Sequence, residues 1–385
     1  MQTLSDKRWF KMSSLSPFTL LLTSVGSLLG QNMLDSLADR RQAVRVVGLN
    51  SLAQNPRNFH CDQVYLVPST QDRDFLTHFE AILASEKPDL ILAGRDDDVL
   101  LLTHLKAKHP ELAPLIPYGD PGSAEIMRDK LKSHDFAKSH GLPFVDSCLL
   151  DATLTRSRLA AFLKQVGFPL IIKPLAGFGS NGVYILTAPD QLEALWPFKN
   201  PLLLQPYLSP PPDLQAYFGQ YQQAMPLFFQ IPDEHQHAFQ CIIGPQGEIG
   251  EGFCAEMKLV MGRVEQVERQ YHSDLLALGL NCAKAFRDQG WRGSFNLQAK
   301  RNQQQQWQIF EFSPRMTGSL SARRLLGYDE LGLLLAQFAP EAHFPCDPFQ
   351  SESRGMVMRS LKDDFIPYEA LQQLKDEQQW QKKSS

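Results

Sequence analysis

A glycine-rich stretch near the middle of the chain has residue types that suit a phosphate-binding loop. Residues 173–183 read KPLAGFGSNGV and contain the pattern G-x-G-x-x-G, with Gly177, Gly179 and Gly182 as its glycines and a hydroxyl at Ser180. In a dinucleotide site this pattern follows a strand and opens a helix. Here it runs into VYILT, whose β-branched and apolar residues predict another strand. We therefore expect a flap between two antiparallel strands, with free N–H groups that can cover phosphates.

Two alternatives to a nucleotide flap remain open. Lys173 ends the preceding strand and could neutralise phosphate charge, but a plain glycine-rich hairpin with a surface lysine would have the same sequence. An NAD(P)-dependent oxidoreductase is the other alternative, because the loop SVGSLLGQN lies between a strand and a helix. Its glycine spacing is wrong, and the second strand ends at Asn50, where an NAD site places Asp or Glu. That class of enzyme is therefore the weaker interpretation.

Polar and apolar residues alternate along two predicted strands, SFNLQAK and WQIFEFSP, joined by RNQQQQ. Successive side chains of a strand point to opposite faces. The face directed at a core would hold Phe295, Leu297, Phe310 and Phe312. The other face would hold Asn296, Gln298, Glu311 and Ser313, with Arg315 two residues beyond.

This polar face has the chemistry of a magnesium site. Mg²⁺ prefers few protein oxygens together with phosphates and water, and Gln298, Glu311 and Ser313 supply such oxygens. Arg315 would lie where negative charge develops during phosphoryl transfer. A half-exposed sheet with a surface Glu–Arg pair is the alternative, since such pairs are common and contribute little.

The elements that must position these residues fall into two regions. Predicted strands at 18–24, 44–50, 63–69 and 88–94 alternate with helices, which indicates a parallel sheet covered on both faces. The second region opens with one predicted helix over 124–143, closed by Gly141 and Pro143. Its strands are expected at 168–174, 183–187, 202–208, 237–244, 248–259, 294–300 and 307–314, with a helix at 273–290.

We expect a leader at 1–16, a first domain at 17–122, a second domain of two lobes at 123–200 and 201–345, and a C-terminal segment at 346–385. Residues 209–233 look like an insertion or a mobile loop, and the polar end QQWQKKSS is predicted to fray.

Composition excludes several classes of protein. The chain has 385 residues, of which 43% are hydrophobic and 21% charged, with a net charge of -4, so a nucleic-acid partner has no electrostatic support. The six cysteines lack zinc-ligand spacing, which favours a reduced, cytoplasmic protein. No segment reaches the roughly 18 apolar residues of a membrane span. The run FTLLLTSVGSLLG, preceded by basic residues, imitates a signal peptide but leads directly into an amphipathic helix.

The segments FPLIIKPLAGFGSNGV, LLLQPYL and GSFNLQAK…WQIFEFSPR, in this order, resemble the ATP-grasp superfamily. The likeness is greatest to the large subunit of carbamoyl phosphate synthetase and to carboxylate–amine ligases such as the pyrrolysine-pathway ligase, and it covers residues 18–345. The resemblance implies an ATP-grasp fold, of class α/β and α+β, preceded by a Rossmann-like parallel-sheet domain.

The resemblance also implies roles at the matching positions. The nucleotide contacts would be Lys130, Lys173, Gly177, Gly179, Ser180, Gly182, Gln205, Tyr207 and Leu208. Gln298 and Glu311 would bind Mg²⁺, and Arg315 would steady an acyl-phosphate as the catalytic arginine.

Two positions depart from the family pattern. Ser313 stands where the family usually has a magnesium-binding asparagine, and serine is a shorter and poorer ligand. The ribose-binding glutamate is best matched by Gln236, with Glu234 as the alternative.

The implied activity is an ATP-dependent carboxylate–amine, or carboxylate–thiol, ligase that forms an acyl-phosphate and releases ADP and phosphate. ATP and Mg²⁺, or Mn²⁺ in its place, are the implied cofactors. The implied partners are a small carboxylate, an amine and a second copy of the chain as a homodimer. Ser313 and Gln236 keep a non-catalytic ATP sensor open as the alternative. A carbamoyl-phosphate-type enzyme needs two such units, and this chain has room for one.

Two further groups of charged residues are candidate substrate contacts. Arg95, Asp96 and Asp97 follow the fourth predicted strand, where open α/β sheets bind ligands, and could hold an amino-acid-like substrate. Acidic residues at a helix N-terminus are the alternative explanation. Arg323 and Arg324 form a possible anion clamp, again beside a purely structural alternative.

Overall fold

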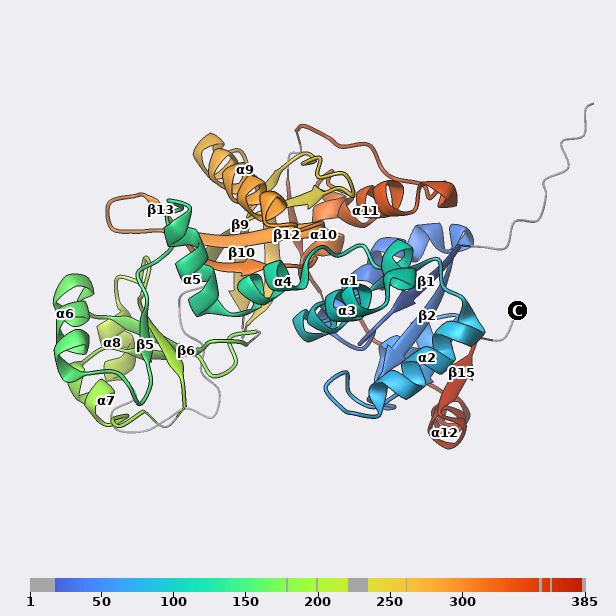
Figure 1. Cartoon of the computed structure of the whole chain (residues 1–385), viewed down its shortest axis with the longest axis horizontal. Helices are drawn as coiled ribbons and strands as arrows, with labels where there is room; N and C mark the ends of the chain where they lie inside the picture. Colours follow the sequence, from blue (N-terminus) through green and yellow to red (C-terminus); the bar gives the residue numbers. More distant parts are fainter. Residues whose placement is uncertain are drawn as a thin grey trace, which may run out of the picture.

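The computed structural model describes residues 18–382, apart from residues 178, 199, 221–234, 261, 353–354 and 361. Three sheets organise these residues: a four-stranded, a six-stranded and a five-stranded sheet, seen from left to right in Figure 1. The predicted leader, residues 1–16, lies outside the described residues. No helix in the described part of the chain combines the length and the apolar character that crossing a bilayer requires.

The five-stranded sheet has the strand order β15-β3-β2-β1-β4, and its first four strands in the chain run parallel. They are β1 (Phe18–Leu22), β2 (Val44–Asn50), β3 (Gln63–Leu66) and β4 (Leu90–Leu92). The helices between and after them are α1 (Leu28–Leu37), α2 (Phe75–Glu86) and α3 (Asp96–Lys108). Leu20 packs with α1 on one face of the sheet, and Leu21 packs with α2 and α3 on the other. The continuous apolar run FTLLL therefore forms a strand buried on both faces, which confirms the predicted parallel sheet.

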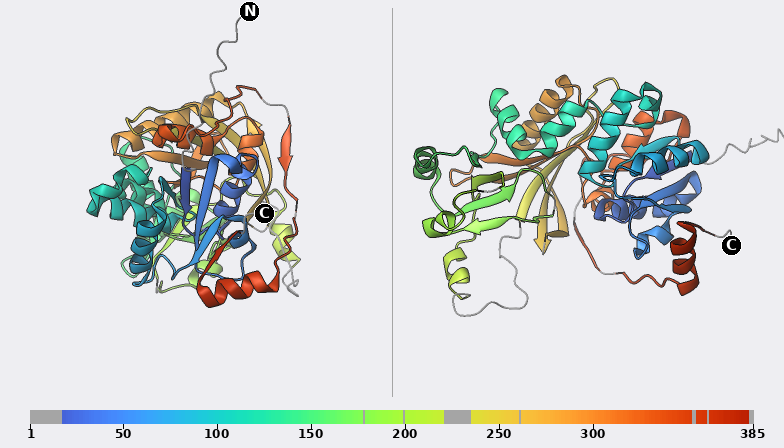
Figure 2. Two further views of the ribbon diagram at one scale, coloured as in Figure 1. Left: turned by 90° about the vertical axis from the view of Figure 1, so that its right-hand side faces the viewer. Right: turned by 60° about the horizontal axis from the view of Figure 1, so that its bottom comes forward.

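Within the C-terminal segment, the polar end QQWQKKSS is predicted to fray, and this is wrong for its described residues, 378–382. After α12 (Tyr368–Glu377), β15 (Gln379–Gln381) pairs antiparallel with β3 and completes the sheet at its edge. Trp380 packs edge-on against Phe59 with ring centroids 5.2 Å apart. Figure 2 shows this segment running from the six-stranded sheet back to the five-stranded one. The polar composition of QQWQ hid a strand whose only large apolar side chain faces the protein.

Replacing Trp380 by alanine should therefore destabilise the protein by about 2 kcal/mol, less than a fully buried tryptophan because the ring is half-buried. Urea unfolding measures this loss. Gln379→Ala, on an exposed position of the same strand, is the matched control and should change stability little. Equal stabilities of the two variants would show that β15 contributes nothing to the sheet.

The six-stranded sheet has the order β13-β12-β9-β10-β11-β14, with neighbouring strands antiparallel. Its strands are β9 (His235–Ile243), β10 (Phe253–Val260), β11 (Arg263–Gln270), β12 (Gly293–Arg301), β13 (Trp307–Ser313) and β14 (Met356–Met358). The accompanying helices are α9 (Ser273–Asp288), α10 (Leu320–Leu325) and α11 (Glu330–Phe338). Sequence patterns did not predict β11 or β14, because β11 is strongly charged and β14 is an edge strand of three residues.

The four-stranded sheet carries the flap. Its order is β5-β8-β6-β7, formed by β5 (Cys148–Leu150), β8 (Leu202–Pro206), β6 (Leu170–Pro174) and β7 (Tyr184–Leu186). β6 and β7 pair antiparallel, so the residues after the glycine pattern form a strand, as predicted. The helices α6 (Arg156–Val166), α7 (Pro189–Glu193) and α8 (Leu214–Gly219) belong to the same region of the chain. α8 lies within the stretch predicted as an insertion, and most of the rest of that stretch, 221–233, lies outside the described residues.

The single helix predicted over 124–143 is two helices, α4 (Pro121–Arg128) and α5 (Lys130–Ser139). Asp129 separates them with extended backbone angles, and its Oδ1 accepts hydrogen bonds from the N–H groups of Leu131 and Lys132. This is an N-cap, which an aspartate forms readily. The apolar periodicity continues across the break and therefore gave no sign of it. The break places Lys130 in the first turn of α5.

Candidate functional site

A cavity of about 810 Å³ lies where residues of the three sheets and the loops beside them meet. Of the predicted nucleotide contacts, those that line it are Lys130, Lys173, Gly177, Gly179, Ser180, Gln205, Tyr207, Leu208 and Gln236. The predicted metal and catalytic residues Gln298, Glu311, Ser313 and Arg315 line it too. Gly182 is the one predicted contact that does not. Residues separated by more than 180 positions in the chain thus share one space.

The flap's conformation depends on its glycines. Gly179 and Gly182 have φ angles of +58° and +72°, a region that favours glycine. A side chain at Gly182 would also meet Pro174 Cγ at 3.0 Å. The flap reaches across to the turn between β10 and β11, where a Cβ on Gly262 would lie 2.9 Å from the Gly179 carbonyl oxygen. Gly182 therefore shapes the flap from outside the cavity.

Two buried lysines line the cavity. Lys173 and Lys130 are only 6% and 7% exposed. On β6, Ile171 and Lys173 face the cavity, while Leu170 and Ile172 pack in the core of the four-stranded sheet. Lys173 Nζ donates to the Phe310 backbone oxygen at 3.3 Å, and Lys130 Nζ lies 3.9 Å from Glu311 Oε1. Burial, reinforced by the charge of Lys130, lowers the pKa of Lys173 to about 7. Glu311 is the carboxylate near these two buried lysines, so one anionic group faces two cationic ones.

The β12–β13 hairpin presents its polar residues to the cavity as the alternation predicted. Cross-strand partners are Gln298 with Glu311 and Asn296 with Ser313. Phe295, Leu297 and Phe312 are buried on the opposite face. Phe310, expected on that core face, does pack against the core, but it also lines the cavity. A β-bulge shifts the register after Gln298, so that Ala299 pairs with Ile309 and Phe310 is the extra residue.

Asn296 is a site residue to which sequence reasoning gave a face but no role. It is 1% exposed and lines the cavity, and its Nδ2 donates to the Phe239 backbone oxygen at 3.0 Å. Its Oδ1 has no hydrogen-bond partner among the described residues. Buried acceptors are normally satisfied, so an orphan oxygen in a cavity wall indicates a ligand. The alternation with Gln298 was the signal that could have found it.

The acidic residues after β4 bind arginines. Arg315 Nη2 pairs with Asp96 Oδ2 at 2.8 Å, and Ser313 Oγ donates to Asp96 Oδ1 at 3.4 Å. Although burial opposes it, the Arg315 guanidinium lowers the pKa of Asp96. Asp97 pairs with Arg128 at 2.9 Å. Among these neighbours, the Arg95 guanidinium alone has no hydrogen bond or ion pair with any described residue, and it lines the cavity. Of the three candidate substrate contacts, Arg95 is therefore the one whose side chain has no hydrogen-bond or ion-pair partner among the described residues.

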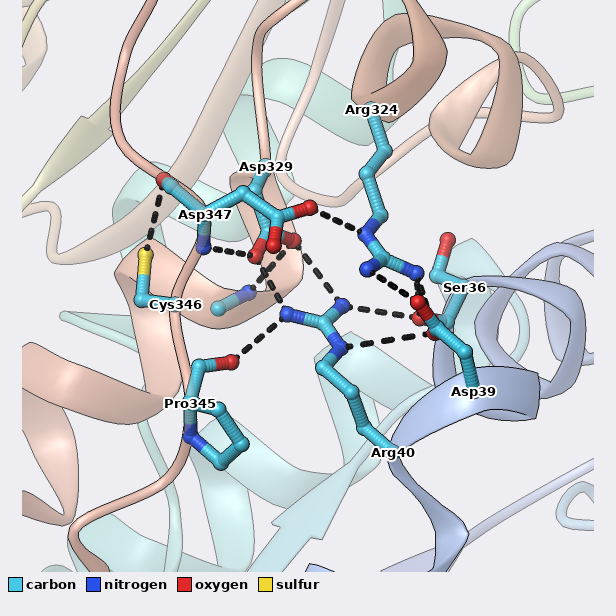
Figure 3. Close-up of polar contacts among 9 residues, drawn as sticks. Ser36, Asp39, Arg40, Arg324, Asp329, Pro345, Cys346 and Asp347 are labelled. Carbon is cyan, nitrogen blue, oxygen red and sulfur yellow. Dashed lines mark hydrogen bonds and ion pairs between the residues drawn. The ribbon is translucent and has the colours of Figure 1, made fainter.

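Arg323 and Arg324 do not form an anion clamp. Arg323 is 2% exposed and is bound to Glu330, Thr317 and Ser319. Arg324 binds Asp39 and Asp347 and helps join α10 to the end of α1, as Figure 3 shows. The adjacent Arg40–Asp329 pair, also in Figure 3, belongs to the same network. Their guanidinium groups serve to hold the fold, which doublets of arginine in a sequence cannot reveal.

The remaining predicted contacts also line the cavity. Gln205 Nε2 donates to Ser147 Oγ at 2.9 Å, and Tyr207 N donates to the Pro169 oxygen at 3.0 Å. Gln236 stands on β9 opposite Met257, which also lines the cavity. Glu234, the alternative ribose contact, lies outside the described residues. The roles of these side chains stay predictions.

Comparison with solved structures decides the fold. N5-carboxyaminoimidazole synthetase from Staphylococcus aureus, complexed with ADP, superposes with a TM-score of 0.62 at 15% identity, covering 89% of this chain and 80% of its own. The biotin carboxylase domain of Hydrogenobacter thermophilus 2-oxoglutarate carboxylase, a dimer with MgADP, ADP and bicarbonate, gives 0.61 at 14% identity over 84% and 70%. This chain has the ATP-grasp fold. At these identities the likeness establishes the architecture alone.

The similarity found by sequence covers a smaller part of this chain than the superposition on the ATP-grasp structures does. A formate-dependent phosphoribosylglycinamide formyltransferase from Synechococcus sp. is 23% identical over 180 residues, which are 47% of this chain. The matched part spans 42% of that relative's length. No protein-family model matches the chain. The flap, the paired lysines and the Gln298–Glu311 hairpin thus lie on an ATP-grasp frame with a divergent sequence.

Proposed function

We propose that this protein is an ATP-dependent ligase that activates a small carboxylate as an acyl-phosphate and transfers it to an amine or another nucleophile. The observation that carries the proposal is the convergence on one cavity of the flap, two buried lysines, a wall of oxygen donors and Arg315. Adenine nucleotides bound to the structurally similar S. aureus and H. thermophilus proteins support it. A homodimer, like that of the H. thermophilus domain, is part of the proposal.

The donor set fits Mg²⁺ delivered with a nucleotide. The described residues contain no cluster of three His, Cys, Asp or Glu that could hold a metal by itself. Gln298, Glu311 and the orphan oxygen of Asn296 instead offer the few hard oxygens that Mg²⁺ uses beside phosphates. When bound, the ion would neutralise phosphate charge. Asn296 is the cross-strand partner of Ser313 and would supply the amide oxygen that Ser313 lacks.

Asn296→Ala should therefore raise the Mg²⁺ concentration needed for half-maximal nucleotide binding by about 10-fold, as loss of one ligand-shell contact commonly does. Titration of Mg²⁺ at constant ATP, followed by calorimetry, measures it. Ser294→Ala is the matched control: it is equally buried on β12 and hydrogen-bonded to Gln240 and Glu330, but it does not line the cavity. Equal Mg²⁺ dependence in both variants would contradict a role for Asn296.

The chain's own residues supply positioning and charge. Lys130 and Lys173 would hold the phosphates, and the flap N–H groups would cover them and keep water from the acyl-phosphate. Arg315 would stabilise charge on the transferring phosphoryl group. Asp96, which follows β4 of the five-stranded sheet, holds the Arg315 guanidinium in place. No side chain is needed as a covalent nucleophile, since phosphoryl transfer depends mainly on orientation and electrostatics.

The carboxylate substrate would enter at the end of the cavity lined by Arg95, Gly94 and Ser27. Because Asp96 and Asp97 are already paired with arginines, Arg95 is the residue proposed to bind the substrate anion. ADP release from MgATP, measured against a panel of amino acids and small carboxylates, tests the proposal. A carboxylate should raise ADP release in wild-type protein and not in Arg315→Ala. ATP binding with no stimulation by any substrate would instead favour the non-catalytic sensor, for which the substitution at Ser313 is the specific argument.

A further inference from the structure

Arg128 connects the root of the flap to the five-stranded sheet. It is the last residue of α4, its side chain is 12% exposed, and it lines the cavity. Its Nη1 donates to the Gly177 carbonyl oxygen at 3.0 Å, and its Nε donates to Asp97 Oδ1 at 2.9 Å. One guanidinium thus bridges the first residue of the flap and the first turn of α3.

Asp97 is itself held on both oxygens. Its Oδ2 accepts a hydrogen bond of 2.9 Å from Gln71 Nε2, in the loop after β3. Its neighbour Asp96 holds Arg315. Two consecutive carboxylates at the carboxyl end of β4 therefore bind two arginines, one at the flap root and one at the phosphoryl-transfer end. Arg95, the proposed substrate contact, directly precedes them.

The flap root has a second anchor in the same short segment. The N–H of Lys130 donates to the Leu175 carbonyl oxygen at 2.9 Å. Residues 128–130 thus fix the chain at two points where it leaves β6, before the residues with positive φ. Of these two anchors, only the Arg128 side chain continues to the substrate end of the cavity.

We propose that Arg128 and Asp97 are positioning residues that couple the substrate end of the cavity to the nucleotide flap. The Arg128–Asp97 pair fixes the position of the Gly177 carbonyl relative to α3. The flap that closes over the phosphates is thereby held at a fixed position relative to Arg95, the proposed substrate contact. A ligand that contacts Arg95 then acts on the flap through the adjacent Asp97. This inference rests on the proposed function, because it assigns the pair a role in the same reaction.

Three variants test the pair, Arg128→Ala, Asp97→Asn and the double variant, and Lys132→Ala is the control. Lys132 lies two residues beyond Lys130 in α5. It forms an exposed ion pair with Glu125 and does not line the cavity, which makes it a matched control. Calorimetry gives the Kd for MgADP. Hydrogen exchange of the amides at 179–187 reports the flap in nucleotide-free and MgADP-bound protein.

We expect each single variant to weaken MgADP binding about 10-fold, as loss of a charge-assisted hydrogen bond does. Flap amides should exchange faster in both variants, even without nucleotide. The double variant should be no weaker than either single one, because the two residues act as a unit. Lys132→Ala should match the wild type.

Three results would overturn the inference or its premise. If the amides at 179–187 exchanged hydrogen at the wild-type rate in Arg128→Ala, the pair would not control the flap. Variants with lower thermal stability but unchanged Kd would make the pair merely structural. Wild-type protein that binds no MgADP would overturn the proposed function itself, a result distinct from the other two.

Discussion

Replacing Glu311 by alanine is expected to lower substrate-stimulated ADP release by about 10³-fold, or ~4 kcal/mol of transition-state stabilisation. Glu311 is the one carboxylate among the predicted magnesium ligands, it stands across from Gln298, and it lies 3.9 Å from Lys130. Its loss would remove a proposed metal ligand and the carboxylate that lies near the two buried lysines. Single-turnover measurement of ADP formation at saturating MgATP tests this.

Glu268→Gln is the control for this experiment. Glu268 is an exposed acid on β11 of the same sheet and does not line the cavity, so its replacement should leave ADP release unchanged. Glu311→Gln should recover part of the activity, because an amide oxygen is still a hard donor although it carries no charge. ADP release by Glu311→Ala within a factor of about 10 of wild type would exclude a catalytic metal at this position, since loss of a ligand costs more than that.

The affinity for MgATP should fall as the pH rises above neutrality. Lys173 has a pKa of about 7 in the free protein, so it is increasingly neutral above that pH, whereas a bound phosphate requires the ammonium form. Each pH unit above the free pKa then costs up to tenfold in affinity, which gives about 50-fold between pH 7 and pH 9. Calorimetry in buffers of different ionisation enthalpy should show proton uptake on binding.

Two variants isolate the effect. Lys173→Arg keeps a permanent charge and should remove most of the pH dependence. Lys173→Met should weaken binding about 100-fold and make it independent of pH, since a charged phosphate contact is lost. A pH profile in Lys173→Met that parallels the wild type would assign the titration to another group.

The same shift has a consequence for stability of the nucleotide-free protein. The folded-state pKa of Lys173 is lowered from 10.5 to about 7, so between these values the unfolded chain binds the proton and the folded chain does not. Stability should therefore increase as pH rises through this window and be lowest below pH 7. Lys173→Met should stabilise the free protein at neutral pH, because it removes an ammonium group whose burial costs more than its contacts with the Phe310 oxygen and Glu311 recover.

Most of the site residues that the sequence predicts follow from the alternation of side chains along strands. A side chain's face on a strand follows from its position in the alternation, so Gln298 and Glu311 were assigned to one surface before any pairing was known. The β-branched residues after Gly182 predicted a strand and hence a flap for the same local reason. The continuous apolar run at Phe18–Leu22 predicted a strand buried on both faces. Each of these depends on backbone geometry within a few residues.

Tertiary structure decided what depends on distant partners. The pairing of β12 with β13 contains a bulge that brings Phe310 to the cavity wall while it still packs against the core, and neither strand's sequence predicts that shift. Arg323 and Arg324 are held by Asp39, Glu330 and Asp347. Asp96 and Asp97 bind Arg315 and Arg128, which leaves the Arg95 guanidinium without a hydrogen bond or ion pair among the described residues. Charged side chains are satisfied by whichever opposite charge the fold brings near. The local sequence of this chain thus determines which chemical groups are present and which face of a strand they occupy. Contacts between residues far apart in the sequence determine which of those groups are bound within the fold and which face the cavity.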